Sequence, residues 1–234
     1  AINIVDKFNE VGNKFAISSG GIGDALQRSA ASFAAANNTI DESIALVVAA
    51  NNVIQDPDTV GTMWKTVTMR IRGAKTELEE AGLETEYMAE STASLRDAIK
   101  GLTNVDGLGG FDIMKDEKTF KSTYDIILGI GEVWEKMSDI DQAALLELVA
   151  GKRQGNALAA TLTNLEDLKA ALEASENSAG SAMKEQEVWL GSLEAKINQF
   201  KASFESLSST IISDDLVGAI IDFGTTFVHT IDNI

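Results

Sequence analysis

The chain has 234 residues, a formal net charge of −17, and 44% hydrophobic but only 6% aromatic residues. The apolar fraction is too high for a disordered protein. The excess of carboxylates argues against proteins that bind nucleic acids or anionic membrane surfaces, because both rely on basic patches. Because the chain has no cysteine, it can form neither disulfides nor thiolate metal sites.

The sequence shows no signal-peptide pattern and no run of about 18 apolar residues that would span a membrane. It contains a single proline, Pro57, and it begins and ends within amphipathic patterns. Because proline interrupts helix interiors, its scarcity favours a chain made of helices. We expect this sequence to be a segment of a longer polypeptide.

Apolar residues at three- and four-residue spacing predict helices along the first part of the chain. Thr39 and Glu42 have the form of a capping box, and Pro57 marks a helix end because proline constrains the residue before it. The predicted segments are a helix that carries Ile4, Phe8, Val11 and Phe15, a helix at 24–36, a helix from Thr39 to the 56–58 turn, and a helix from about Thr59 to Ala81 with Gly82 as its C-cap.

The pattern changes at 105–116, which holds three glycines and has no helical period. We expect a loop there, with a short extended piece at 111–114. Helical spacing then resumes. The predicted segments are a helix from Phe120 to Trp134, a helix opened by Ser138 and Asp141 and ended at Gly151, a leucine-bearing helix from Leu158 to Leu172 close to a heptad pattern, a long amphipathic helix with Val188, Leu193, Ile197, Phe200, Phe204, Leu207 and Ile211, and an apolar helix at 214–231.

No period-two alternation of useful length is present, so the predicted fold class is all-α. We expect a compact multi-helix domain of short antiparallel or orthogonal helices, followed by longer amphipathic helices. The proposed division is an N-terminal helical subdomain at 1–104, a glycine-rich connector at 105–116 and a C-terminal helical subdomain at 117–234. The same segments could also form one continuous domain.

Polar residues that could form a catalytic or metal site each have a simpler structural interpretation. His229 is the only histidine and lies among apolar residues, where a packed or exposed helix position is the simpler reading. Neighbouring carboxylates near helix ends usually face solvent or favour a helix dipole rather than perform acid–base chemistry. This interpretation applies to Glu77, Glu79 and Glu80, and to Asp214 and Asp215.

Two segments resemble binding motifs only superficially. Asp112, Asp116 and Glu117 lack the alternating oxygen ligands of an EF-hand loop. The glycines at 107–110 lack the Gly-Lys-Ser/Thr sequence of a phosphate-binding loop. We therefore predict no catalytic, cofactor-binding or metal-binding residues.

Basic and aromatic residues are interpreted as structural as well. Lys152 and Arg153 are expected to pair with nearby carboxylates. Trp64, Trp134 and Trp189 stand at helical positions, where they are expected to anchor helices in the core.

The final segment, Leu216 to Ile234, leaves two interpretations open. It could be a membrane-active helix, or it could pack on another protomer. Asp222, His229 and Asp232 interrupt its apolar pattern, and it lacks the basic face of an interfacial helix, so the second interpretation is favoured.

An ordered series of short blocks resembles the core region of the tape measure proteins of long-tailed bacteriophages. No single block is specific, but their order over roughly Ser29 to Leu207 is. The blocks are Gly61-Thr62 with the stretch Met69-Arg70-Ile71-Arg72-Gly73, then Phe111-Asp112-Ile113-Met114-Lys115-Asp116, Asp125-Ile126-Ile127-Leu128 with Trp134, Leu146 to Gly151 with Lys152, Arg153 and Asn156 to Leu162, and Ser178-Ala179-Gly180-Ser181-Ala182. Glu117 and Lys118 depart from the glycine that is common in this family's hairpin.

The resemblance implies a structural virion protein without catalytic residues or cofactors. Several copies would self-associate in the lumen of the tail tube, contact tail tube and tail tip proteins, and not bind nucleic acid directly. Polypeptide length would set tail length, and the protein, made in the host cytoplasm, would leave ahead of the genome at infection. The alternative is a membrane-interacting translocation or pore-forming protein, with membrane contact through regions at or beyond the C-terminus, whereas an enzyme is the least supported class.

Overall fold

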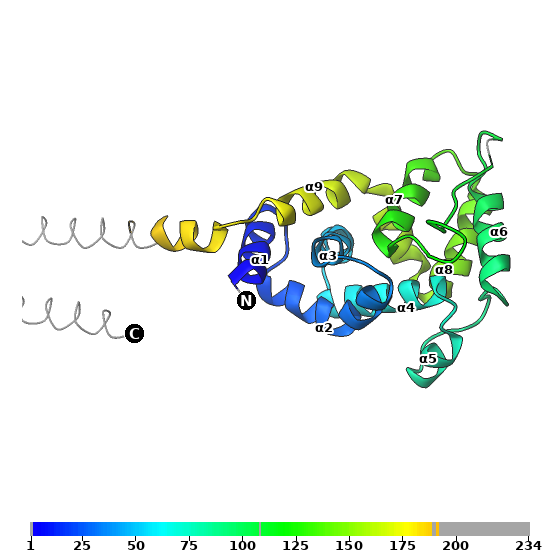
Figure 1. The fold of residues 1–234 in the computed structure, drawn as a ribbon, viewed down its shortest axis with the longest axis horizontal. Coiled ribbons are helices and arrows are strands. Elements are labelled where there is room, and N and C mark those ends of the chain that lie inside the picture. The colour runs from blue at the N-terminus through cyan, green and yellow to red at the C-terminus, as the bar shows by residue number, and fades with distance from the viewer. Residues whose placement is uncertain (1, 108, 189–190, 192–234) are drawn as a thin grey trace, which may run out of the picture. The chain divides into compact units, whose positions relative to one another are not determined.

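The computed structural model describes residues 2–107, 109–188 and 191, and its first unit is a bundle of short helices (Figure 1). Contacts divide the chain into a first unit, Ala1–Ala182, and a second unit, Met183–Ile234. In the second unit the described residues 183–188 and 191 are helical. The account below concerns the first unit.

The predicted all-α class is confirmed for the described residues. The only regular pairing of extended backbone in them is an isolated antiparallel bridge between Met114 and Phe120, next to the expected extended piece. The helices are α1 (Ile2–Lys14), α2 (Ser19–Ala35), α3 (Ile40–Ile54), α4 (Pro57–Ile71), α5 (Lys75–Glu80), α6 (Thr92–Leu102), α7 (Thr123–Trp134), α8 (Asp139–Thr163) and α9 (Leu165–Glu176).

Helix α3 is the centre of the first unit. Its residues from Ser43 to Asn51 are all buried, because it contacts α2, α4, α7, α8 and α9. Figure 1 shows α3 nearly end-on between α2 and α9. A helix that is apolar on every side can be stable in water only in such a position.

Helices α2 and α4 cross at very short distance. A Cβ atom added at Gly61 would lie 2.5 Å from the carbonyl oxygen of Ala25, which is backbone and cannot rotate away. A glycine is therefore required where α4 contacts α2, and this explains the Gly-Thr block structurally.

Trp64 anchors α4 to α3 in the manner expected from its helical position. Its side chain is completely buried, its Nε1 donates a 2.8 Å hydrogen bond to the carbonyl oxygen of Leu46, and its ring lies 6.2 Å from that of Phe33. Trp134 is also buried. Both tryptophans are thus core residues, as predicted.

Three helix starts follow the sequence signals closely, whereas α2 begins at Ser19, five residues before the predicted start. Thr39 and Glu42 form the predicted capping box at α3, and Ser138 caps α8 by accepting from the Asp141 amide. Pro57 is the first residue of α4, where its missing N–H removes no helical hydrogen bond.

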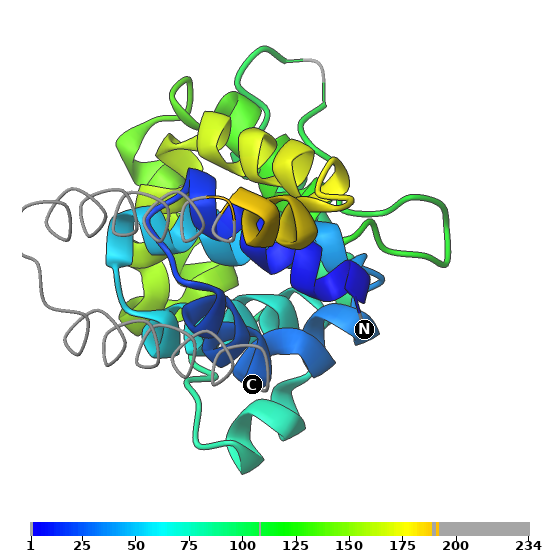
Figure 2. The same cartoon turned by 90° about the vertical axis from the view of Figure 1, so that its left-hand side faces the viewer.

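The predicted end of the fourth helix at Ala81 is wrong. Helix α4 ends at Ile71, and Gly73 has φ 69°, a left-handed conformation that stops the helix. A separate short helix, α5, follows and projects from the unit in both views (Figures 1 and 2). Gly82, with φ 67°, lies just beyond the end of α5.

The predicted helix end at Gly151 is instead a bend. Helix α8 runs from Asp139 to Thr163, and Gly151 within it has φ 71° and ψ 176°. The predicted single helix from Leu158 to Leu172 is also wrong, because Asn164, with φ −115° and ψ 51°, separates α8 from α9. The described residues of the 105–116 segment, 105–107 and 109–116, contain no helix, as predicted. Helices from both sides of it, such as α3 and α9, pack together in the first unit, and the division into two subdomains stays a prediction.

Candidate functional site

The structure brings two of the quoted sequence blocks together at the bend of α8. Arg70, near the end of α4, lies against the bend, and the segment that follows α5 covers it with Glu84. We call Arg70, Glu84 and Gly151 the Arg70 junction. It forms because a cation sits on the apolar face of α4, three residues after the buried Val67.

Arg70 is only 2% exposed, and backbone carbonyls surround its guanidinium group. Its Nε and Nη2 atoms donate to the carbonyl oxygens of Leu148 at 3.2 Å and Glu147 at 2.9 Å. Its Nη1 and Nη2 atoms donate to those of Glu84 at 2.8 Å and Glu86 at 2.7 Å. These bonds offset the cost of burying a charged group.

Burial lowers the pKa of Arg70 from its ordinary value, and the nearby carboxylates of Glu84 and Glu147 oppose that shift. An arginine remains protonated at neutral pH even so. The junction therefore holds a permanent positive charge, which suits the carbonyl ends of a helix segment.

Glu84 completes the junction from the other side of the bend. Its carboxylate accepts from the backbone amides of Lys152 at 3.3 Å and Arg153 at 3.2 Å. These amides open the second half of α8, where a negative charge is favoured. The two halves of α8 are therefore capped by side chains from outside the helix.

The exposed Lys152 side chain adds an outer contact to the junction. Its Nζ donates to the Tyr87 hydroxyl at 2.9 Å, lies 4.4 Å from the centre of the Tyr87 ring and is 3.7 Å from a Glu147 carboxylate oxygen. The hydrogen bond with Tyr87 is the main cause that raises the pKa of Lys152. The predicted pairing with a carboxylate is confirmed for Lys152, whereas Arg153 contributes its backbone amide.

Arg72, two residues after Arg70, makes a related contact on the opposite side of α4's end. Its Nη2 donates to the carbonyl oxygens of Ala36 at 2.7 Å and Lys121 at 2.8 Å, and its guanidinium lies 4.5 Å from the centre of the Phe120 ring. Burial lowers the pKa of Arg72. Both arginines of the block thus join chain segments that are distant in sequence.

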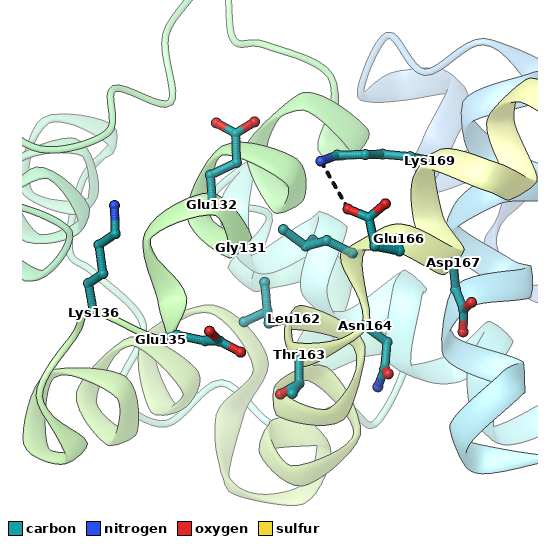
Figure 3. Close-up of a pocket in the computed structure, with 11 residues that line it drawn as sticks. Gly131, Glu132, Glu135, Lys136, Leu162, Thr163, Asn164, Glu166, Asp167 and Lys169 are labelled. Atoms are coloured by element: carbon teal, nitrogen blue, oxygen red, sulfur yellow. Dashed lines mark hydrogen bonds and ion pairs between the residues drawn. The ribbon is translucent and has the colours of Figure 1, made fainter.

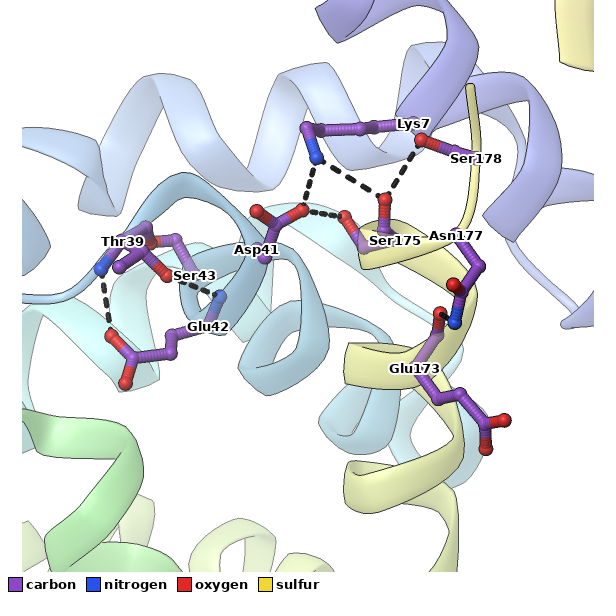
Figure 4. Close-up of polar contacts among 9 residues, drawn as sticks. All are labelled: Lys7, Thr39, Asp41, Glu42, Ser43, Glu173, Ser175, Asn177 and Ser178. Carbon is purple, nitrogen blue, oxygen red and sulfur yellow. Dashed lines mark hydrogen bonds and ion pairs between the residues drawn. The ribbon is translucent and has the colours of Figure 1, made fainter. Parts of the chain in front are cut away.

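A second polar cluster fastens α1 to α3 and α9. In Figure 4 the Lys7 ammonium lies between the Asp41 carboxylate and the Ser175 carbonyl oxygen, to which it donates at 2.5 Å and 3.2 Å. The Ser175 hydroxyl donates to the same Asp41 oxygen at 2.6 Å. Each of these groups has a hydrogen-bond partner within the cluster, so the cluster serves to hold α1 against α3 and α9.

The Figure 3 cavity, about 410 Å³ in volume, lies where α7 and α8 end and α9 begins. Its lining carries charged side chains of both signs, and Lys169 forms an ion pair with Glu166 at 3.5 Å. The Thr163 hydroxyl in the Figure 3 lining donates to the Ala159 carbonyl oxygen at 2.9 Å. A cavity of similar volume lies at the bend of α8, beside Gly151.

The acidic residues singled out in the sequence lie apart from the junction. Glu77, Glu79 and Glu80 are exposed on α5. Asp112 forms a two-bond ion pair with Arg96, which lowers the Asp112 pKa to about 2. Among the described residues, no group of three or more His, Asp or Glu side chains is arranged to hold a metal ion.

The remaining sequence candidates lie outside the described residues. They are His229, Asp214, Asp215, Trp189 and the segment Leu216–Ile234. Within the described residues, none of the helices is long and apolar enough to cross a membrane.

No pattern in the sequence pointed to the role of Glu84, which lies in a polar stretch between α5 and α6. For Arg70 a signal existed, because it is the one cation on the otherwise apolar face that Met63 and Val67 define. A cation at such a position needs carbonyl or carboxylate partners when it is buried, although the sequence does not say where those partners come from.

Comparison with known proteins identifies the family. The model of the phage-related minor tail protein family matches residues 1–151, a span that includes Gly61, Arg70, Glu84 and Gly151. No solved structure matches the chain. Since the match covers well over half of the sequence, the chain belongs to the phage-related minor tail protein family, and it is a structural protein of the bacteriophage tail.

Proposed function

We propose that the chain is part of a tail tape measure protein, which occupies the tail tube lumen and sets tail length by its own length. The observation that carries this proposal is the order of the sequence blocks from Gly61 to Ala182, together with the family match over residues 1–151. Packing supports a structural role, because the Arg70 junction joins α4 to α8. Self-association and contacts with tail tube and tail tip proteins belong to this proposal.

A ruler made of this sequence must have an extended form. A continuous helix rises about 1.5 Å per residue, so the first unit would span about 270 Å as a single rod. The compact form of a unit this size has a radius of gyration of about 16 Å. We propose that the first unit is compact before assembly and extended inside the tube.

Deletions in the full-length protein would test the proposal. At about 1.5 Å per residue, removing Ile2–Ala35 should shorten tails by about 50 Å, and removing Ile2–Glu176 should shorten them by about 260 Å. Tail lengths would be measured by electron microscopy of the assembled particles. A steeper slope, near 3.3 Å per residue, would indicate a fully extended backbone rather than a helix.

A point variant provides the matched control. Trp64→Ala weakens the compact fold but leaves the number of residues unchanged, so tails should keep the wild-type length. If both deletions left the tail length unchanged, this region would not act as a ruler. Tails that Trp64→Ala shortens as much as a deletion does would also contradict a ruler in this region.

A further inference from the structure

The bend in α8 depends on the backbone conformation of a single glycine. Gly151 has φ 71° and ψ 176°, a conformation that residues with a Cβ atom avoid. A Cβ atom at Gly151 would also lie 3.0 Å from a Glu84 carboxylate oxygen and 3.4 Å from Arg70 Nη1. Residues on both sides of Gly151 are helical, so this one position interrupts an otherwise continuous helix.

The capping groups at the bend replace the hydrogen bonds of a straight helix. In an α-helix the amide of residue i donates to the carbonyl of residue i−4, so Lys152 N would donate to the Leu148 oxygen. In the bent form Arg70 Nε donates to that oxygen at 3.2 Å, and Glu84 accepts from that amide at 3.3 Å. The interrupted bond thus has both of its ends satisfied from outside.

The segment that carries Glu84 is the least packed part of the junction. None of the residues from 79 to 94, which run from the end of the projecting helix α5 to the first turn of α6, is buried (Figure 2). Segments with few buried contacts open at lower free energy than the core. If this segment leaves, the α8 amides lose their cap, and Arg70 loses two carbonyl partners and becomes open to water.

We propose that α8 is a two-state element, bent while the 79–94 segment covers Arg70 and continuous from Asp139 to Thr163 when that segment leaves. In the continuous form the α8 amides and carbonyls bond to each other, and water replaces the carbonyl partners of Arg70. The second half of α8 then changes direction relative to the first half. This inference rests on the contacts at the bend and does not depend on the ruler function.

Spin-label distances would test the two states in the intact chain. The sequence has no native cysteine, so cysteines introduced at the exposed positions Ala143 and Thr163 would carry the only labels. In a continuous helix twenty residues span about 30 Å. The wild-type background should give mainly a shorter distance, whereas Gly151→Ala, which strains the bend and favours a helix, should give mainly about 30 Å.

Gly155→Ala is the matched control. Gly155 lies in the same helix with ordinary space around it, since a Cβ atom there would meet Leu146 Cβ at 3.6 Å. It should therefore leave the short distance unchanged. If Gly151→Ala keeps its helical circular dichroism and also keeps the short distance, the two-state proposal is wrong.

A second variant covers the possibility that Gly151→Ala does not fold. Glu84→Gln adds no atoms but removes the charge that caps the Lys152 and Arg153 amides. It should raise the fraction of molecules with the long distance several-fold over wild type. A Glu84→Gln distance distribution identical to that of wild type would overturn the proposal in that case.

Discussion

Helix α3 and the bend of α8 are both buried, but different forces hold them. Nine successive residues of α3 are buried, and most of them are apolar, so its place depends on packing spread over many side chains. The bend depends on a few directed hydrogen bonds to Arg70 and Glu84. When a packed apolar side chain is shortened, the loss of stability grows with the volume removed. When one partner of a polar junction is removed, the remaining buried groups lose their hydrogen bonds at once.

Truncation in the packed region should have the largest effect. Trp64→Ala removes the largest completely buried side chain and its hydrogen bond to Leu46, so the free energy of unfolding should fall by about 3–5 kcal/mol. Urea unfolding followed by circular dichroism would measure the loss. Trp64→Phe, which retains most of the ring volume, should lose less than half as much, and equal losses would argue that packing is not the main term.

Removal of the buried cation should be the next largest change. Arg70→Met keeps the apolar base of the side chain but removes the group that donates to four carbonyl oxygens, which should cost about 2–4 kcal/mol. Arg153→Met makes the same charge change at an exposed neighbouring position and should stay within about 0.5 kcal/mol of wild type. If the two variants were equally stable in urea unfolding, Arg70 would not hold the bend.

A methyl group at the crossing of α2 and α4 should have an intermediate effect. Gly61→Ala places Cβ against the Ala25 carbonyl, so the helices must separate and the unfolding free energy should fall by about 1–3 kcal/mol. Gly23→Ala on α2 meets nothing within 4 Å and should stabilise the chain slightly, because alanine favours a helix. Stabilisation by both substitutions would show that the crossing tolerates a Cβ atom.

The partly exposed Asp112–Arg96 pair should contribute least. Its pairing with Arg96 lowers the Asp112 pKa to about 2 from 3.8, so its contribution is present above about pH 4 and is lost as pH falls through 2. The urea midpoint of Asp112→Asn should lie slightly below that of wild type at pH 6, and the gap should close towards pH 2. A gap of constant size across this range would exclude the ion pair as its cause.

Local signals in the sequence predicted the starts of α3 and α8, and that of α4 to within two residues. The capping box at Thr39, the cap at Ser138 and the turn before Pro57 all act over three or four residues, so neighbouring residues decide them. The apolar spacing also predicted correctly that Trp64 and Trp134 are buried. Such local signals do not determine how one helix is oriented relative to the next.

The errors arose where distant residues decide the local structure. Apolar and polar spacing runs on through Gly73, yet α4 ends before it. At Gly151 a helix end was predicted, but the chain resumes the helix after one residue because Glu84, far earlier in the sequence, caps the next amides. The partners of Arg70 are carbonyl oxygens, which every residue has, so no residue type could reveal them in advance.

The fastening of α1 has a consequence for biosynthesis. Lys7 bonds to the Ser175 carbonyl, and Asp6 accepts from the amides of Gly180 and Ala182. Such contacts join the ends of a very long loop, and loops of this kind close late in folding. The contacts of α1 with Ser175, Gly180 and Ala182 can therefore form only after those residues, 168 to 176 positions further along the chain, have been synthesised.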